Sequence, residues 1–306
     1  MVGHESSDDA AVYRLNESQA LVATTDFFTP IVDDPYDFGR IAATNAISDI
    51  YAMGARPIMA LALLGVPLGK LPMSAAQRII AGGHDVCERV GVPIAGGHSI
   101  DSPEPLYGLV ALGLIDPAKV KRNDGARPGD VLILGKGLGI GVMGAALKKG
   151  ELKEKAYRQM LETATQLNTP GLRLAEMEGV HALTDVTGFG LLGHLLEILR
   201  GSKLQARLAF DRVPILSAAR QLVEAGYATG ASDRNWESCK ESVRLPAEWP
   251  PWRRKILTDP QTSGGLLVAC DRATAQAVLD VFKAEGFLHA AEIGTLSAGA
   301  PHIVVA

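Results

Sequence analysis

Alternating and continuous apolar stretches in the first third of the chain predict five strands and two helices. The polar turn Asn16-Glu17-Ser18 separates the first two strands and predicts a hairpin. Asp34-Pro35 is a suitable start for the first helix, and Gly54 is a suitable stop. The predicted strands are residues 10–15, 20–28, 57–66, 92–95 and 106–115, and the predicted helices are residues 36–53 and 74–90. This pattern indicates a strand-rich unit of mixed α and β structure.

The pattern changes at residues 116–130, where Pro117 and Pro128-Gly129 are typical of a linker. We therefore predict two domains, residues 1–116 and 117–306. In the second domain the predicted strands are 131–134, 204–210, 266–269 and one at the C-terminus, the predicted helices are 140–149, 153–167, 191–200, 217–225 and 273–285, and 226–251 is polar and irregular. The predicted fold class is α+β, with mixed sheets and packed helices.

Composition narrows the class of protein. A chain of 306 residues, 47% hydrophobic and 21% charged, is long enough to bury the cores of two domains. The net charge of -4, without a Lys/Arg run, argues against a nucleic-acid partner. The longest apolar run, residues 58–64, is too short to span a membrane, and the polar, acidic start is unlike a signal peptide. The widely spaced Cys87, Cys239 and Cys270 predict neither a disulfide framework nor a zinc site and fit a reducing cytoplasm.

Aspartates occur at positions that folding alone does not explain, above all in the helix predicted at 36–53. This helix is apolar nearly all round, yet Asn45 and Asp49 lie one turn apart on one face. A buried carboxylate needs a partner, and Mg²⁺ binds carboxylate oxygens together with substrate phosphates. The alternative is that Asp49 caps a neighbouring loop or pairs with a cation such as Arg40. The other unusual Asp positions, within residues 6–9, 24–26 and 184–190, favour the metal.

Glycine-rich loops beside Asp, Ser and Thr predict anion binding. Residues 184–190, TDVTGFG, lead directly into a predicted helix, so amides at its N-terminus can face a phosphate while Asp185 faces a metal. Residues 259–265, DPQTSGG, form a second loop of this kind, and Gly97-His98-Ser99 follows a predicted strand. The alternative for each loop is a turn with Asp as a cap, since Gly, Asp and Ser favour turns for conformational reasons alone.

Another glycine pattern, residues 139–144, matches the dinucleotide-binding fingerprint but is rejected. Helical sequence at 151–166 follows it, where the fingerprint requires a second strand ending in an acidic residue. No Walker-type phosphate-binding motif occurs in the sequence, and its seven histidines show no zinc-ligand spacing. His194, after the loop at 184–190, is near the predicted chemistry.

Six motifs in register across nearly the whole chain resemble those of selenophosphate synthetase. They are SSDDAAVY, TTDFF, GRIAATNAISDIYAMG, GGHSIDSPEP, TDVTGFGLLGH and DPQTSGGLL. The resemblance implies a two-domain fold like that of aminoimidazole ribonucleotide synthetase, and a cytoplasmic homodimer formed through strands of the first domain. It also implies conversion of ATP, selenide and water to selenophosphate, AMP and orthophosphate. The implied cofactor is Mg²⁺, with a monovalent cation as a further candidate.

The resemblance implies roles for individual residues. Asp9, Asp49 and Asp185 match the family's magnesium-linked aspartates, and Asp26 with Asp49 match positions that contact the nucleotide. The remaining matches are to the phosphate-side loop, Ser6, Ser7 and Asp8, and to the segment with which a partner subunit reaches the ATP, Gly97, His98 and Ser99.

The resemblance departs at the start of the chain. Family members carry, upstream of SSDDAAVY, a glycine-rich segment with a reactive cysteine or selenocysteine and then a lysine, which this sequence does not contain. We expect a truncated chain or a start codon assigned downstream, and none of the three cysteines lies in a comparable loop. Two alternatives therefore stand beside the enzyme: a nucleotide-binding or regulatory module, and a kinase or synthetase of the same superfamily that acts on another acceptor.

Overall fold

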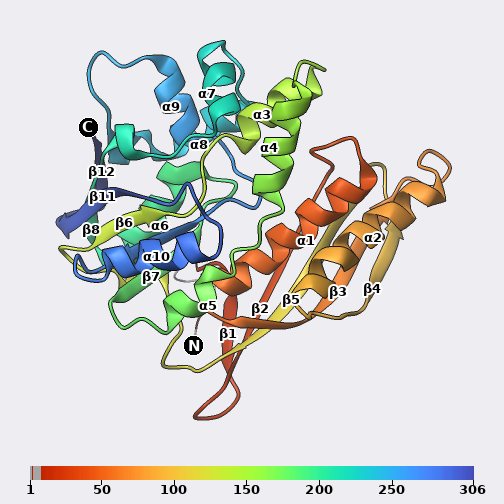
Figure 1. Cartoon of the computed structure of the whole chain (residues 1–306), viewed down its shortest axis with the longest axis horizontal. Coiled ribbons are helices and arrows are strands. Elements are labelled where there is room, and N and C mark those ends of the chain that lie inside the picture. Colours follow the sequence, from red (N-terminus) through yellow and green to blue (C-terminus); the bar gives the residue numbers. More distant parts are fainter. Residues whose placement is uncertain (1, 3–7) are drawn as a thin grey trace.

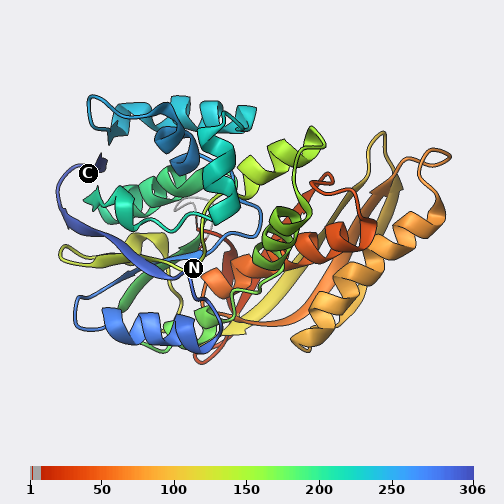
Figure 2. The same cartoon turned by 45° about the horizontal axis from the view of Figure 1, so that its top comes forward.

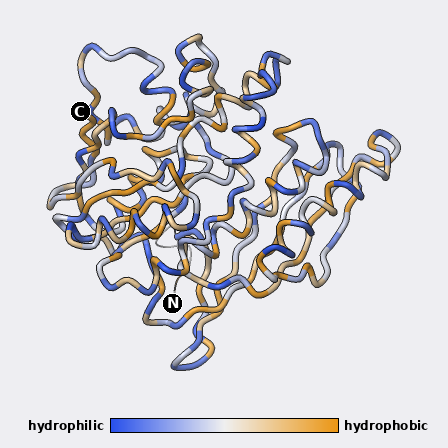
Figure 3. Tube along the Cα trace, in the orientation of Figure 1, coloured by the Kyte–Doolittle hydropathy of each residue, from blue (hydrophilic) through white to orange (hydrophobic). Residues whose placement is uncertain are grey.

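The computed structural model describes residue 2 and residues 8–306. Figure 1 shows two lobes, each with its own sheet, and the chain passes from the first lobe to the second after residue 115. Hydrophobic stretches recur along the strands and helices of both lobes in Figure 3. The predicted α+β class, with mixed sheets and packed helices, is confirmed.

The first lobe contains a five-stranded mixed sheet in the order β1-β2-β5-β3-β4. Its elements are β1 (Ala11–Arg14), β2 (Ala20–Phe28), α1 (Pro35–Ala52), β3 (Arg56–Val66), α2 (Met73–Arg89), β4 (Ile94–Asp101) and β5 (Leu106–Ile115). Neighbouring strands are antiparallel except for β3 and β4, which are parallel. Asp34 caps α1 through its Oδ1 atom, which accepts from the amides of Tyr36 and Asp37, as the sequence predicts.

Helices α1 and α2 lie side by side across one face of this sheet (Figure 1). They approach closely because glycine occupies the contact: a Cβ on Gly39 would lie 1.9 Å from the Ile79 carbonyl oxygen, and one on Gly82 would lie 2.0 Å from that of Tyr36. The opposite face of the sheet carries no helix of the described chain. The pairing register places Phe27, Gly108, Leu63 and His98 in one row across that outer face.

The second lobe contains a seven-stranded mixed sheet in the order β7-β10-β6-β11-β8-β12-β9. Its strands are β6 (Val131–Leu134), β7 (Val180–Asp185), β8 (Leu204–Leu208), β9 (Val243–Arg244), β10 (Leu266–Cys270), β11 (Ala291–Ala298) and β12 (His302–Val305). Its helices are α3 (Ile140–Lys148), α4 (Glu154–Ala164), α5 (Pro170–Ala175), α6 (Gly190–Ser202), α7 (Ser217–Glu224), α8 (Gly230–Cys239), α9 (Pro251–Leu257) and α10 (Ala275–Ala284). Strand β6 is buried on both faces, because alternate residues enter two separate hydrophobic clusters.

Both strands that pair with β6 are antiparallel to it, which confirms that the glycine pattern at 139–144 is no dinucleotide fingerprint.

Two interpretations of the sequence are wrong. Residues 226–251 are not irregular throughout, since α8 and β9 form there. The strand predicted at 92–95 is instead β4, which includes Gly97, His98 and Ser99 rather than ending before them. Glycine is required in this strand because a Cβ on Gly97 would lie 2.0 Å from the Ala62 carbonyl oxygen.

The two lobes meet along α1. This helix contacts α4, α5 and β7 of the second lobe, and both views show α4 and α5 beside it (Figures 1 and 2). The junction is tightly packed, since a Cβ on Gly171 of α5 would lie 2.1 Å from the Tyr51 carbonyl oxygen of α1. The C-terminal half of α1 therefore presents its polar residues to the second lobe.

Candidate functional site

Four predicted aspartates come together where the lobes meet. We call Asp9, Asp26, Asp49 and Asp185 the acidic cluster. Asp26 lies on β2, Asp49 on α1 and Asp9 just before β1, whereas Asp185 ends β7 of the second lobe. Asp185 is fully buried, and the other three side chains keep partial exposure. Solvent and ligands can therefore reach Asp9, Asp26 and Asp49, whereas Asp185 lies beneath them.

Each carboxylate of the acidic cluster accepts one hydrogen bond from a neutral side chain. Thr24 Oγ1 donates to Asp49 Oδ2 at 2.6 Å, and Asn45 Nδ2 donates to Asp26 Oδ2. Two further bonds join the lobes: Thr184 Oγ1 donates to Asp9 Oδ1 at 2.7 Å, and Ser48 Oγ donates to Asp185 Oδ2. The carboxylates are therefore oriented without a salt bridge to a cationic side chain of the described residues.

Burial raises the pKa of every member of the cluster, and repulsion from Asp185 raises the pKa of the other three further. For Asp9 and Asp49 the pKa is raised well above the ordinary value, first by burial and then by the negative charge of Asp185. The same two causes raise the pKa of Asp26. Burial also raises the pKa of Asp185, against the opposing effects of the Ser48 hydrogen bond, His194 and Lys136. A cation bound among the four would relieve this unfavourable concentration of charge.

The cluster fits a metal ion that is shared with a ligand. Asp9 Oδ2 is buried and has no hydrogen-bond partner, so one lone-pair acceptor is unused. Within residues 2 and 8–306, no three His, Cys, Asp or Glu side chains stand close enough to hold a metal by themselves. Mg²⁺ in nucleotide sites is usually bound by one or two carboxylates, with phosphate and water oxygens completing its coordination. The donor set is suited to this kind of ion.

The alternative partner for Asp49 is excluded. Arg40 pairs with Asp37 at 3.3 Å, and Asp49 accepts from Thr24 instead. The two glycine loops also differ from each other. Asp185 of the first loop belongs to the acidic cluster, whereas Asp259 of the second lies against the start of α3, where its Oδ2 accepts from the Val142 amide at 3.2 Å. Asp259 therefore follows the capping interpretation.

The other predicted residues are placed as follows. Asp8 Oδ1 accepts from the Asn123 amide at 2.7 Å, beside the connection between the lobes. Ser6 and Ser7 lie outside the described residues. Gly97, His98 and Ser99 are exposed on β4, which is separated from β2 by β5 and β3. Three strand spacings amount to about 14 Å, so within one chain these residues do not join the acidic cluster.

Several polar residues of the site were not predicted, namely Thr24 as a donor, Ser48, Lys136 and Asn168. Asn168 Nδ2 donates to Ser48 Oγ at 2.7 Å and to the Gly264 carbonyl at 2.8 Å. Ser48 is fully buried in a mostly apolar helix, one residue before Asp49, and that context was its only sequence signal. Lys136 follows four apolar residues of β6 and Gly135, which is an unusual position for a lysine.

The three cysteines are unsuitable as nucleophiles. All are free and buried. Burial raises the pKa of Cys87 to about 12, that of Cys239 to about 11 and that of Cys270 to about 12, so the reactive thiolate is scarce at neutral pH. The prediction that none of them replaces the family's reactive residue agrees with this burial.

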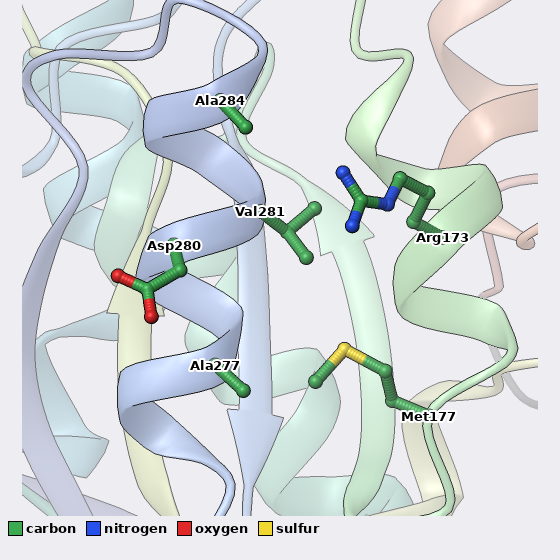
Figure 4. A pocket seen from close by; sticks show the side chains of 6 residues that line it. All are labelled: Arg173, Met177, Ala277, Asp280, Val281 and Ala284. Atoms are coloured by element: carbon green, nitrogen blue, oxygen red, sulfur yellow. The ribbon is translucent and has the colours of Figure 1, made fainter.

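A separate hollow lies between α5 and α10 and is lined by Arg173, Met177, Ala277, Asp280, Val281 and Ala284. In Figure 4 the Asp280 carboxylate points away from the Arg173 guanidinium, and the side chains between them are apolar. Its lining contains no group of converging polar side chains like the acidic cluster, so we do not assign the chemistry to it.

Comparison with known proteins identifies the family. The profile described as AIR synthase related protein, N-terminal domain, matches residues 7–115, and its C-terminal counterpart matches residues 127–306. A selenide, water dikinase of Pseudomonas straminea is 57% identical over 305 residues, covering 100% of this chain and 85% of the relative. The chain belongs to the selenide, water dikinase family. Members from Dechloromonas aromatica and Rhizobium meliloti are 58% and 52% identical, and this chain spans 88% and 87% of their lengths.

Solved structures show that the selenide, water dikinase fold is shared more widely. Thiamine-monophosphate kinase from Stenotrophomonas maltophilia superimposes with a TM-score of 0.74 at 21% identity, covering 100% of this chain and 90% of that one. Hydrogenase maturation protein HypE in complex with ATP gives a TM-score of 0.70 at 22% identity, covering 95% and 83%. At these identities the likeness establishes the fold. No described helix is both long and apolar enough to pass through a membrane.

Proposed function

We propose that this chain makes selenophosphate, converting ATP, selenide and water to selenophosphate, AMP and orthophosphate at the acidic cluster. Membership of the selenide, water dikinase family supports the reaction. The observation that carries the location is the convergence of four carboxylates from both lobes, with one buried carboxylate oxygen of Asp9 lacking a partner. The HypE structure solved with ATP supports nucleotide binding by this fold.

Asp9, Asp49 and Asp185 would contribute carboxylate oxygens to Mg²⁺ binding together with phosphate and water oxygens, and Asp26 with Asp49 would face the nucleotide. Bound there, the metal supplies neutralisation of the triphosphate charge, without which four carboxylates would repel ATP. The chain's own donors act by orientation: Thr24, Thr184 and Ser48 each fix one carboxylate oxygen of the metal-holding aspartates. Helix α6 begins five residues after Asp185, and its N-terminus offers amide groups suited to a phosphate.

The test of this proposal combines binding with product analysis. Mg²⁺-dependent ATP affinity is measured by calorimetry for the wild-type chain and for Asp49→Ala, and products formed with selenide are followed by phosphorus NMR. We expect the variant to lose metal-dependent binding, and turnover to give selenophosphate with AMP. Binding without turnover would favour the nucleotide-binding module, and ADP without AMP would favour a superfamily kinase with another acceptor. Unchanged affinity in Asp49→Ala would refute the assigned site.

We infer further that two chains form a homodimer through the outer face of the first sheet, and that the partner's segment containing Gly97, His98 and Ser99 reaches the nucleotide. On this face Phe27 is 49% exposed, and His98 ends the row that begins with it. Apolar side chains left exposed on a sheet are typical of an interaction surface. We expect Leu63→Glu to be monomeric by light scattering, and Leu288→Glu, which changes an exposed leucine of the second lobe, to stay dimeric. A dimeric Leu63→Glu would contradict this interface.

Two further parts of the proposal concern conditions. Free, buried cysteines support action in a reducing cytoplasm. A potassium chloride titration of the calorimetric signal tests the monovalent cation that the family resemblance implies.

A further inference from the structure

Lys136 is a buried cation without an ion-pair partner among residues 2 and 8–306. Only 2% of its surface is exposed. Its ammonium donates to two backbone carbonyls, those of Gln166 at 2.6 Å and Ser263 at 2.7 Å. A buried ammonium that has only neutral acceptors is costly, and an apolar side chain of similar length would fill the same space at lower cost. The lysine therefore calls for an explanation beyond packing.

The contact with Ser263 connects Lys136 to the first lobe. Ser263 is fully buried and has a φ of 53°, a left-handed conformation that is unfavourable for a residue with a side chain. In this conformation its amide donates to Asn45 Oδ1 of α1 at 2.6 Å, while its carbonyl accepts from Lys136. One strained residue thus hydrogen-bonds to both lobes at once.

Asn45 completes the connection to the acidic cluster. It accepts from Ser263 through Oδ1 and donates through Nδ2 to the Asp26 carboxylate. The neighbouring Gly264 carbonyl is held in turn by Asn168, which also bonds Ser48. A continuous chain of hydrogen bonds therefore runs from the Lys136 ammonium through Ser263 and Asn45 to Asp26.

The environment of Lys136 agrees with a role toward this charged region. Burial lowers the pKa of Lys136 to about 7, and the negative charge of Asp185 acts in the opposite direction. In return, Lys136 is among the groups that lower the pKa of Asp185. Its charge is thus felt by the acidic cluster although no carboxylate contacts it.

We propose that Lys136 is a positioning residue of the nucleotide site, which acts through Ser263 and Asn45 to fix the Asp26 carboxylate across the junction between the lobes. This inference rests on the proposed function, because it concerns Mg²⁺-ATP binding at the same cluster. It assigns to the loop at 259–265 the task of joining the lobes.

Lys121 provides a matched control. Its ammonium also donates to two backbone carbonyls, those of Met177 at 3.2 Å and Val180 at 2.7 Å. Burial likewise lowers the pKa of Lys121, but the charges that act on it are Glu176 and Arg127 rather than the acidic cluster. Lys121→Met therefore removes a half-buried ammonium with the same kind of acceptors, which lies outside the proposed chain of hydrogen bonds.

The experiment is a double-mutant cycle read out as Mg²⁺-ATP affinity, with thermal unfolding measured alongside. We expect Lys136→Met and Asn45→Ala each to weaken binding about tenfold, as expected for loss of a hydrogen bond to a charged group. Because Lys136 and Asn45 belong to one chain of hydrogen bonds, the double variant should bind Mg²⁺-ATP no more weakly than the single variant with the lower affinity. Lys121→Met should bind within about twofold of wild type whatever its loss of stability, and Lys136→Arg should recover part of the affinity.

Each outcome decides the proposal. Wild-type affinity in Lys136→Met, or multiplication of the two losses in the double variant, would overturn it while leaving the proposed function intact. Failure of the wild-type chain to bind Mg²⁺-ATP would overturn both. If Lys136→Met does not fold, Asn45→Ala interrupts the same route without removing the ammonium, and wild-type affinity in that variant would overturn the proposal.

Discussion

Replacing Asp259 by asparagine should remove a large part of the pH dependence of stability. Asp259 is fully buried at the start of α3, where Oδ2 accepts from the Val142 amide and from Gln261 Nε2 at 2.9 Å. Burial raises its pKa from 3.8 to about 7 despite these hydrogen bonds. Asparagine retains an acceptor oxygen and cannot ionise, so it resembles the protonated acid in shape and charge.

The sign and size of the effect follow from proton linkage. Below about pH 4 the carboxyl is protonated in both states and has no effect. Between pH 4 and 7 the unfolded chain ionises while the folded one keeps its proton, so stability falls as pH rises. The difference between 3.8 and about 7 corresponds to about 4 kcal/mol at about 1.36 kcal/mol per unit of pKa. For a domain of this size that is about 10 °C in the unfolding temperature.

The assay is thermal unfolding of wild type and Asp259→Asn, without ligand, from pH 4 to pH 8. We expect the variant to gain stability over wild type as pH rises, with the gain complete just above pH 7. Asp271→Asn is the control. In the turn before α10 the Asp271 carboxylate accepts from the Thr274 amide, and its hydrogen bonds with Thr274 lower its pKa, so its replacement should cost stability above pH 4. Equal pH profiles for Asp259→Asn and wild type would refute the reasoning.

Three further predictions concern folding energetics. Asp49→Ala should raise the unfolding temperature of the ligand-free chain, since it removes a buried carboxylate that Asp185, Asp9 and Asp26 repel, and a lower midpoint in a thermal melt would contradict this. Gly39→Ala should lower the free energy of unfolding in urea by about 2–3 kcal/mol, because its Cβ would meet the Ile79 carbonyl. Gly144→Ala has nothing within 4 Å of its Cβ and should raise the free energy of unfolding by about 0.5–1 kcal/mol. Equal effects of the two substitutions would argue against the close α1–α2 contact. Ser263→Gly should stabilise by about 1 kcal/mol, because it relieves the left-handed φ and removes a buried hydroxyl without a partner, and destabilisation in the same assay would count against strain there.

Most helices and strands could be predicted from the sequence, because hydrophobic periodicity depends only on residues that are close together along the chain. Helix α1 was predicted at 36–53 and occurs at Pro35–Ala52, and strands β2 and β5 match their predicted ranges. The helix at 230–239 was missed because its apolar pattern is weak: of its ten residues only Ser232 and Cys239 are buried. β4 was cut short because two successive glycines usually indicate a turn, and only the approach of β3 explains why Gly97 lies within a strand.

The acidic cluster was predictable from residue type, but the groups that orient it were not. Aspartates within an apolar helix or at a strand end are conspicuous, and they led directly to Asp49 and Asp185. By contrast, Asp259 and Asp185 occupy similar glycine-rich loops, and only the arrangement of α3 and β7 separates a capping role from a place in the cluster. Lys136 and Asn168 donate hydrogen bonds to backbone carbonyls of residues 263 and 264, which are far away in the sequence. Contacts of this kind cannot be predicted from a local sequence pattern.

The placement of Asp185 on one lobe and of Asp9, Asp26 and Asp49 on the other has a mechanical consequence. The negative charge of Asp185 repels the other three carboxylates across the junction between the lobes, which disfavours close contact of the lobes in the ligand-free protein. A bound cation would remove this repulsion and stabilise the contact. Nucleotide binding would then also reduce local opening of the backbone at this junction. Amide hydrogen exchange in the second half of α1 should slow sharply when Mg²⁺-ATP is added, far more than in the outer strands of either sheet.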